Sequence, residues 1–169
     1  MNFRSYVASG KTDYMRAYRL LQEADRFEGC TSMIQDILLE PDRDFGGKSF
    51  LEARQPDGKL CGIAIYRLEP DHIFVELLCS DCKGTGTQML AELSRLARDA
   101  GKPVVRLFST ISARGFYIKS GFGPVPGSDI ADWGQLLQRA AGRTYRRRKS
   151  RKHGSTSLRR HKTRRVLPR

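Results

Sequence analysis

Residues 72–122 read HIFVELLCSDCKGTGTQMLAELSRLARDAGKPVVRLFSTISARGFYIKSGF, and this stretch decides the fold. The apolar run at 72–80 predicts a strand, and the glycine turn DCKGTGT leads from it into an amphipathic helix. A helix start leaves backbone N–H groups unpaired and carries partial positive charge, so the turn predicts an anion site. The amides expected to converge on the anion belong to Lys83, Gly84, Thr85, Gly86 and Thr87.

The helix after the turn is expected to pack on the core and to lead into a second strand. Its apolar positions form one stripe at Met89, Leu90, Leu93, Leu96 and Ala97. Gly101 and Pro103 are expected to end this helix, and VVRLF then predicts a buried strand. The run at 72–80 is almost continuously apolar, which is typical of a strand covered on both faces.

Spacing excludes the two common nucleotide-binding motifs. A Walker A loop needs a glycine five residues before its Gly-Lys-Ser/Thr, and Gly10-Lys11-Thr12 has Ser5 there. The dinucleotide fingerprint G-x-G-x-x-G needs a third glycine after Gly84 and Gly86, where this chain has Met89. The anion at the glycine turn is therefore expected to belong to another ligand.

The end of the stretch resembles a known superfamily. GFYIKSGF begins about thirty residues after the glycine turn and follows VVRLFS, and this order is similar to the last part of the GNAT acetyltransferase fold. The resemblance is specific from Lys59 to Phe122 and weak over the first 58 residues. It implies an α/β domain (an α+β mixed sheet) of the acyl-CoA N-acyltransferase type over 1–142, with acetyl-CoA (coenzyme A) as cofactor. The alternative is a generic α/β unit with a capped helix and a Gly-Phe helix stop.

The resemblance also implies roles for individual residues. Acyl transfer to an amine needs a base for the amine, a donor for the carbonyl oxygen and a proton for the leaving thiolate. Glu76, the lone acid in its apolar strand, is the candidate base, and the alternatives are a position on a solvated edge or an ion pair with an arginine such as Arg106. Tyr117 corresponds to the tyrosine that lies near the thioester sulfur, and the alternative is an aromatic core residue beside Phe116.

The cofactor-binding set comes from the same resemblance. The backbone at 78–79 would meet the pantetheine and the acyl carbonyl, the turn would hold the pyrophosphate, and the last helix would close the site. The residues are Leu78, Cys79, Cys82, Lys83, Gly84, Thr85, Gly86, Thr87, Phe116 and Lys119. Cys79 or Cys82 as an acyl-accepting nucleophile is the weaker hypothesis, because no His-Asp partner lies nearby in the sequence.

Three features depart from the superfamily's pattern. Asp81 stands where Gln or Arg is usual, and Lys83 is the candidate to supply the missing positive charge. Thr110 stands where an asparagine is frequent. Residues 123–142 predict a loop and a short helix, so the final strand pair of the fold is not evident and the acceptor cannot be named. The apolar face of that helix would consist of Trp133, Leu136 and Leu137.

The first 71 residues predict the remaining elements. A strand is expected at 3–8, a helix from Thr12-Asp13 onward, and a second helix at 32–40, before Pro41. KSFLEAR and KLCGIAIYRLEP read as the two strands of a hairpin whose turn contains Asp57-Gly58. This order of elements agrees with the resemblance.

The charge of the chain is concentrated at its end. Residues 1–142 hold 18 Lys/Arg and 18 Asp/Glu, whereas residues 143–169 hold 13 Lys/Arg and no acid. Such a segment is expected to be disordered alone and to bind nucleic acid, a nuclear-import receptor or another acidic partner. The candidate contacts are Arg146, Arg147, Arg148, Lys149, Arg151, Lys152, Arg159, Arg160, Lys162, Arg164 and Arg165.

The four cysteines and the hydropathy pattern suggest an intracellular protein. Cys79 and Cys82 form one C-x-x-C without a second ligand pair, so no metal site is expected and the thiols are predicted to be reduced. No apolar stretch approaches 20 residues, so no membrane span is expected. Nuclear or nucleic-acid-associated localisation is predicted, with the cytoplasm as alternative. Two functions remain: an active N-acetyltransferase, or a nucleic-acid-binding or packaging protein, for example a viral one, that keeps the fold with weak or no catalysis.

Overall fold

A mixed sheet with helices on both faces forms the body of the protein. The computed structural model describes residues 1–39, 45–131 and 134–142, and the basic segment 143–169 and Trp133 lie outside this range. The strands are β1 (Asn2–Val7), β2 (Ser49–Arg54), β3 (Leu60–Leu68), β4 (His72–Ser80), β5 (Val104–Thr110), β6 (Gly123–Pro124), β7 (Ile130–Ala131) and β8 (Gly134–Ala140). The helices are α1 (Lys11–Ala24), α2 (Thr31–Leu39), α3 (Thr85–Asp99) and α4 (Ile111–Lys119). The predicted α/β class is confirmed.

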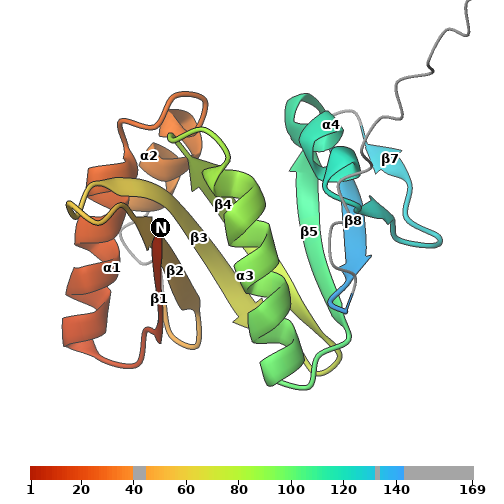
Figure 1. Ribbon diagram of the computed structural model, residues 1–169, viewed down its shortest axis with the longest axis horizontal. Helices are drawn as coiled ribbons and strands as arrows, with labels where there is room; N and C mark the ends of the chain where they lie inside the picture. Colours follow the sequence, from red (N-terminus) through yellow and green to blue (C-terminus); the bar gives the residue numbers. More distant parts are fainter. Residues whose placement is uncertain (40–44, 132–133, 143–169) are drawn as a thin grey trace, which may run out of the picture.

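The sheet has the order β1-β2-β3-β4-β5-β8-β6, and β7 pairs with β8 outside this path (Figure 1). All neighbouring strands are antiparallel except β4 and β5, which are parallel and are joined by α3. A parallel pair needs such a crossover because the chain must return to the same end of the sheet. The predicted hairpin is confirmed as β2 and β3, and Gly58 in its turn has a φ of +89°, which favours glycine.

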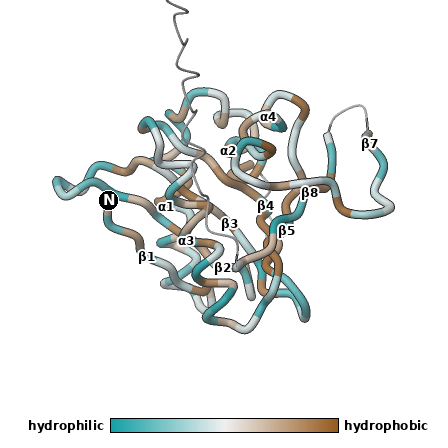
Figure 2. The backbone as a smooth tube through the Cα atoms, turned by 45° about the vertical axis from the view of Figure 1, so that its right-hand side comes forward, coloured by the Kyte–Doolittle hydropathy of each residue, from teal (hydrophilic) through white to brown (hydrophobic). Residues whose placement is uncertain are grey.

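Two apolar clusters occupy the two faces of the sheet. One lies between the sheet and α1 and α2, and the other lies between the sheet and α3, with Tyr117 of α4 in it. Figure 2 shows the central strands β3, β4 and β5 largely in the brown of apolar residues. β2 is buried from Ser49 to Ala53 and β3 from Leu60 to Tyr66, so both layers cover these two strands. β4 instead alternates between buried and half-buried residues, so the expectation of two fully covered faces is wrong for β4.

The end of the domain differs from the prediction. Residues 134–140 form β8, which pairs antiparallel with β5, so the predicted helix is wrong and a final strand is present. Leu137 is fully buried while Leu136 is half-buried, because neighbouring residues of a strand point to opposite faces. Arg139 is buried on the same face as Leu137 and donates to the Ser120 carbonyl at 2.9 Å, which ties β8 to the end of α4.

The cysteines also differ from the prediction. Cys30 pairs with Cys79 and Cys61 pairs with Cys82, with Cα–Cα distances of 6.1 and 5.1 Å, so the expectation of reduced thiols is wrong. No free thiol is left, and the hypothesis of a cysteine nucleophile falls with it. Within the described residues no helix is long and apolar enough to cross a membrane, and no group of His, Cys, Asp and Glu could hold a metal.

Candidate functional site

A β-bulge at Glu76 interrupts the regular pairing of β4 with β3. Leu77 lies opposite Ile65 of β3 and Val75 lies opposite Tyr66, so Glu76 between them has no partner. Val75 belongs to the core cluster under α3, and Leu77 to the cluster under α1 and α2. Two residues that would share a face in a regular strand therefore face opposite sides, as expected where a bulge bends the strand.

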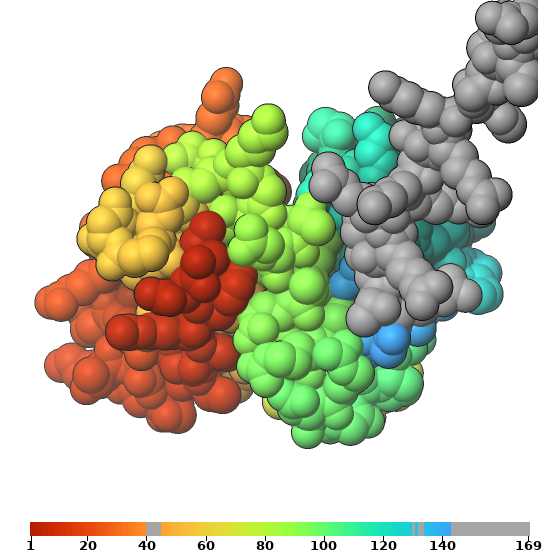
Figure 3. Space-filling view, viewed as in Figure 1, coloured from red at the N-terminus to blue at the C-terminus, as the bar shows by residue number. Residues whose placement is uncertain are grey.

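Beyond the bulge β4 and β5 separate. Their parallel pairing runs from His72 opposite Val104 to Val75 opposite Leu107, although both strands continue beyond it, to Ser80 and Thr110. Figure 1 shows the two strands diverging toward the ends at which α3 and α4 begin. We call the space between residues 76–80 and residues 108–110 the slot. Figure 3 shows a notch there between the green residues before α3 and the teal residues of α4.

The glycine turn lies at the mouth of the slot. Gly84 is the N-cap of α3 with a φ of +82°, and no side chain caps the helix. The Thr85 amide donates to the Cys82 carbonyl at 3.1 Å, whereas the amides of Gly84, Gly86 and Thr87 have no acceptor among the described residues. Thr85 is fully buried and its hydroxyl has no hydrogen-bond partner. The turn therefore offers free donors at the positive end of a 15-residue helix.

Known structures share this fold. Similar proteins include a GNAT-family acetyltransferase from Listeria monocytogenes (TM-score 0.57, 16% identity, covering 82% of this chain and 94% of that chain) and an acyl-CoA N-acyltransferase from Pseudomonas aeruginosa (0.58, 16%, 83% and 100%). The PaiA N-acetyltransferase from Thermoplasma acidophilum, solved in complex with coenzyme A, gives a TM-score of 0.55 at 17% identity, with 83% and 99% coverage. The chain has the GNAT fold. No protein family and no curated protein matches the sequence itself.

Glu76, the one acid of β4, occupies the bulge of this GNAT fold and is paired with two cations. Lys48 Nζ lies 2.8 Å from Glu76 Oε2, and Arg67 Nε lies 2.6 Å from Oε1, so each carboxylate oxygen contacts one cation. Arg106, the partner considered from the sequence, instead contacts Gln138 and lies 3.6 Å from Asp71. The alternative of an ion pair with an arginine is confirmed, but the partner is Arg67 and not Arg106.

Tyr117 lies on α4 with its ring in the core. It packs edge-on against Phe116 and Phe122, at centroid distances of 5.1 and 5.7 Å, and only 7% of its surface is exposed. Burial raises the pKa of Tyr117 to about 12. The phenol is therefore protonated at neutral pH. Its hydroxyl makes no hydrogen bond to a described residue, so it is free to donate.

The residues that depart from the superfamily's pattern have structural roles. The Asp81 amide donates to the Cys61 carbonyl at 3.0 Å, and the Asp81 side chain is exposed, as are Lys83 and Lys119. Thr110 is the N-cap of α4 and accepts from the Ala113 amide at 3.4 Å. Thr110 thus caps α4, a role that an asparagine could also fill.

The disulfides adjoin the slot, a relation that the sequence analysis missed. Cys79 is three residues past the bulge and holds Cys30, which directly precedes α2. Cys82 begins the glycine turn and holds Cys61 on β3. The only sequence signal was the C-x-x-C itself, whose spacing does not identify partners elsewhere in the chain.

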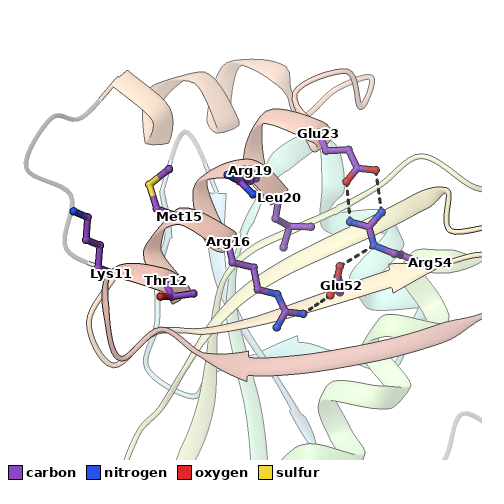
Figure 4. A pocket seen from close by; sticks show the side chains of 9 residues that line it. All are labelled: Lys11, Thr12, Met15, Arg16, Arg19, Leu20, Glu23, Glu52 and Arg54. Atoms are coloured by element: carbon purple, nitrogen blue, oxygen red, sulfur yellow. Dashed lines mark hydrogen bonds and ion pairs between the residues drawn. The ribbon is translucent and has the colours of Figure 1, made fainter.

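A hollow of about 530 Å³ lies away from the slot, between α1 and β2 (Figure 4). Arg54 donates to both Glu23 oxygens, at 3.0 and 2.7 Å, and to Glu52 at 2.8 Å. Arg16 contacts the other Glu52 oxygen at 2.6 Å and stacks on Tyr6 at 3.9 Å. Arg16 and Arg54 thus neutralise Glu23 and Glu52, the acids that line the hollow, and this network ties α1 to the sheet.

Proposed function

We propose that the protein is an acetyl-CoA-dependent N-acetyltransferase with the slot as its cofactor site. The observation that carries the proposal is the separation of β4 and β5 at the Glu76 bulge, with the free amides of the glycine turn at its mouth. The solved T. acidophilum acetyltransferase with this fold is a complex with coenzyme A, which supports the same ligand class here.

The residues present fit such a cofactor. The amides of 84, 86 and 87 would hold a pyrophosphate, and the exposed Lys83 beside them adds the positive charge that Asp81 does not supply. A Cβ at Gly86 would lie 3.1 Å from Ser80 Oγ, so a side chain at this position would crowd the mouth of the slot. Past the bulge, Leu78 and Cys79 stay paired with β3 but no longer pair with β5, so the backbone edge that they turn to the slot is the candidate contact for the pantetheine and the acyl carbonyl. Acetyl-CoA would supply the activated acyl group and a thiolate leaving group.

Glu76 and Tyr117 are the proposed catalytic residues. Glu76 would accept the proton of the incoming amine, directly or through water, and this requires Lys48 or Arg67 to yield one carboxylate oxygen. Tyr117 has a pKa of about 12, whereas an ordinary thiol has a pKa of about 8.5. Complete proton transfer to the thiolate is therefore uphill, and Tyr117 would act mainly as a hydrogen-bond donor that stabilises the departing sulfur.

Calorimetry with acetyl-CoA tests the cofactor, and Tyr117→Phe tests the chemistry. The full chain is expected to bind acetyl-CoA, and no heat at millimolar cofactor would remove the proposal. With a panel of primary amines as acceptors, Tyr117→Phe should lower the rate of thiol release roughly a hundredfold and leave cofactor affinity nearly unchanged. Equal losses in rate and affinity would make Tyr117 a packing residue.

A second function rests on the 13 positive charges and no acid in residues 143–169. We propose that this segment binds the phosphates of nucleic acid, either as an arm of the enzyme or as the main activity of a binding protein built on this fold; an import signal would use the same residues. Replacing the six cations from Arg146 to Lys152 by glutamine in the full chain should flatten the salt dependence of DNA and RNA binding. An unchanged salt dependence would exclude this role.

A further inference from the structure

The ring of Phe116 bridges the mouth of the slot. Phe116 lies on α4, which follows β5. Ser80 is the last residue of β4, and Gly86 lies in the first turn of α3. A Cβ built on Gly86 would lie 3.1 Å from Phe116 Cζ and 3.1 Å from Ser80 Oγ, so the three residues meet at one point. β4 and β5, which lead into these two helices, are no longer paired there, so this ring contact crosses the gap between them.

This position conflicts with an open cofactor site. The free amides of Gly84, Gly86 and Thr87 are the groups a pyrophosphate would need, and the Phe116 ring packs directly on Gly86. A ligand that reaches from this turn down the slot must pass between β4 and α4, where the ring lies. We propose that Phe116 is an aromatic gate that closes the slot in the free protein and must turn away before coenzyme A binds, a role that rests on the proposed function.

The surroundings of Phe116 allow such a movement. The side chain is 37% exposed, and its neighbour Ile118 on the same helix is 44% exposed, so the outer face of α4 offers space to turn into. Gly115, the preceding residue, has no other group within 4 Å of the place a Cβ would take. Opening therefore exchanges the contact of the ring with Gly86 and Ser80 for solvent and does not require α4 to leave β5 and β8.

The gate also touches the proposed catalytic residue. Phe116 packs edge-on against Tyr117 at 5.1 Å, so a turn of the Phe116 ring changes the surroundings of the phenol. Cofactor binding would in this way alter the packing of Tyr117 at the same time as it fills the slot. Phe116 thus acts on the chemistry through Tyr117 and is a positioning residue.

The test compares Phe116→Ala with Ile118→Ala by calorimetry on the full chain with acetyl-CoA and with coenzyme A. Both variants remove an exposed apolar side chain of α4, but only the first removes the gate. If the closed arrangement makes up about 90% of the free protein, only about 10% can bind. Phe116→Ala should then bind about tenfold more tightly, because the apparent Kd is the intrinsic Kd divided by the open fraction. Ile118→Ala should bind as the parent does.

Phe116→Trp provides the opposite change. The larger ring should weaken binding several-fold. On cofactor addition the signals of Tyr117 in an NMR spectrum should move in the parent through both the turning ring and the cofactor, and in Phe116→Ala through the cofactor alone. Unchanged or weaker binding by Phe116→Ala, at a melting temperature equal to that of Ile118→Ala, would overturn the gate while leaving the proposed function intact. No binding by the parent and by every variant would overturn both.

Discussion

Opening the Cys30–Cys79 disulfide should remove a large part of the stability of the fold. The bond spans 49 residues, and closing a loop of that length removes unfolded-state entropy worth about 4 kcal/mol. The Cys61–Cys82 bond spans 21 residues, and the same relation gives about 3 kcal/mol. Since a domain of this size is typically stable by about 5–15 kcal/mol, reduction of both bonds should bring the protein close to unfolding.

Urea unfolding of the parent and of Cys30→Ala/Cys79→Ala measures the effect of the Cys30–Cys79 bond, and adding a reductant to the parent measures the effect of both bonds. For an m-value of about 2 kcal/mol/M, a loss of about 4 kcal/mol lowers the midpoint by about 2 M. The double variant Cys30→Ala/Cys79→Ala should start near this lowered midpoint and respond to the reductant only through Cys61–Cys82. The reasoning is refuted if the parent has the same midpoint with and without reductant, or if alkylation of the native protein followed by mass spectrometry finds free thiols.

Two further predictions concern contacts around the sheet. Gly62→Ala should cost about 1–3 kcal/mol in urea unfolding, because the added Cβ would collide with Met89 Sδ and come within 3.1 Å of the Cys79 carbonyl oxygen, whereas Gly127→Ala has open space and should show only the cost of its positive φ. For Glu23, the hydrogen bond from Arg54 lowers the pKa below its usual value of 4.5, so its stabilising effect is present above pH 4.5 and is lost as the pH falls through the folded-state value. Glu23→Gln should therefore flatten the acid limb of a plot of stability against pH, and an unchanged limb would contradict the role of this ion pair.

The centre of the fold could be predicted because its signals are local. Apolar strands, the glycine turn and the stripe of α3 lie in one continuous stretch, and spacing alone excluded the nucleotide motifs. The slot itself could not be predicted in this way. Val75, Leu77 and Cys79 keep an uninterrupted alternation in the sequence, so nothing marks Glu76 as the bulged residue. The change of face becomes visible only in the register of β4 against β3.

The errors concern residues whose partners are distant in the sequence. Leu136 and Leu137 fit a helical stripe, and GQLLQRA becomes a strand because β5 offers a free edge opposite Leu137. Arg106 lies opposite Phe74 in the parallel register, which carries its guanidinium to Asp71 and away from Glu76. The partners of Cys79 and Cys82 come from the start of α2 and from β3, at separations of 49 and 21 residues.

The segment 79–86 combines covalent restraint with unpaired backbone donors. Cys79 and Cys82 are each fixed by a disulfide, and Gly62 allows α3 to approach β3 closely through Met89 and Thr85. No side chain caps α3, so the turn is held in shape from outside while its own amides stay available. A site preorganised in this way loses little entropy on binding, so the affinity depends mainly on whether the ligand can enter the slot. Because α4 carries no comparable restraint near Phe116, the ring on that side is the part of the site that can move.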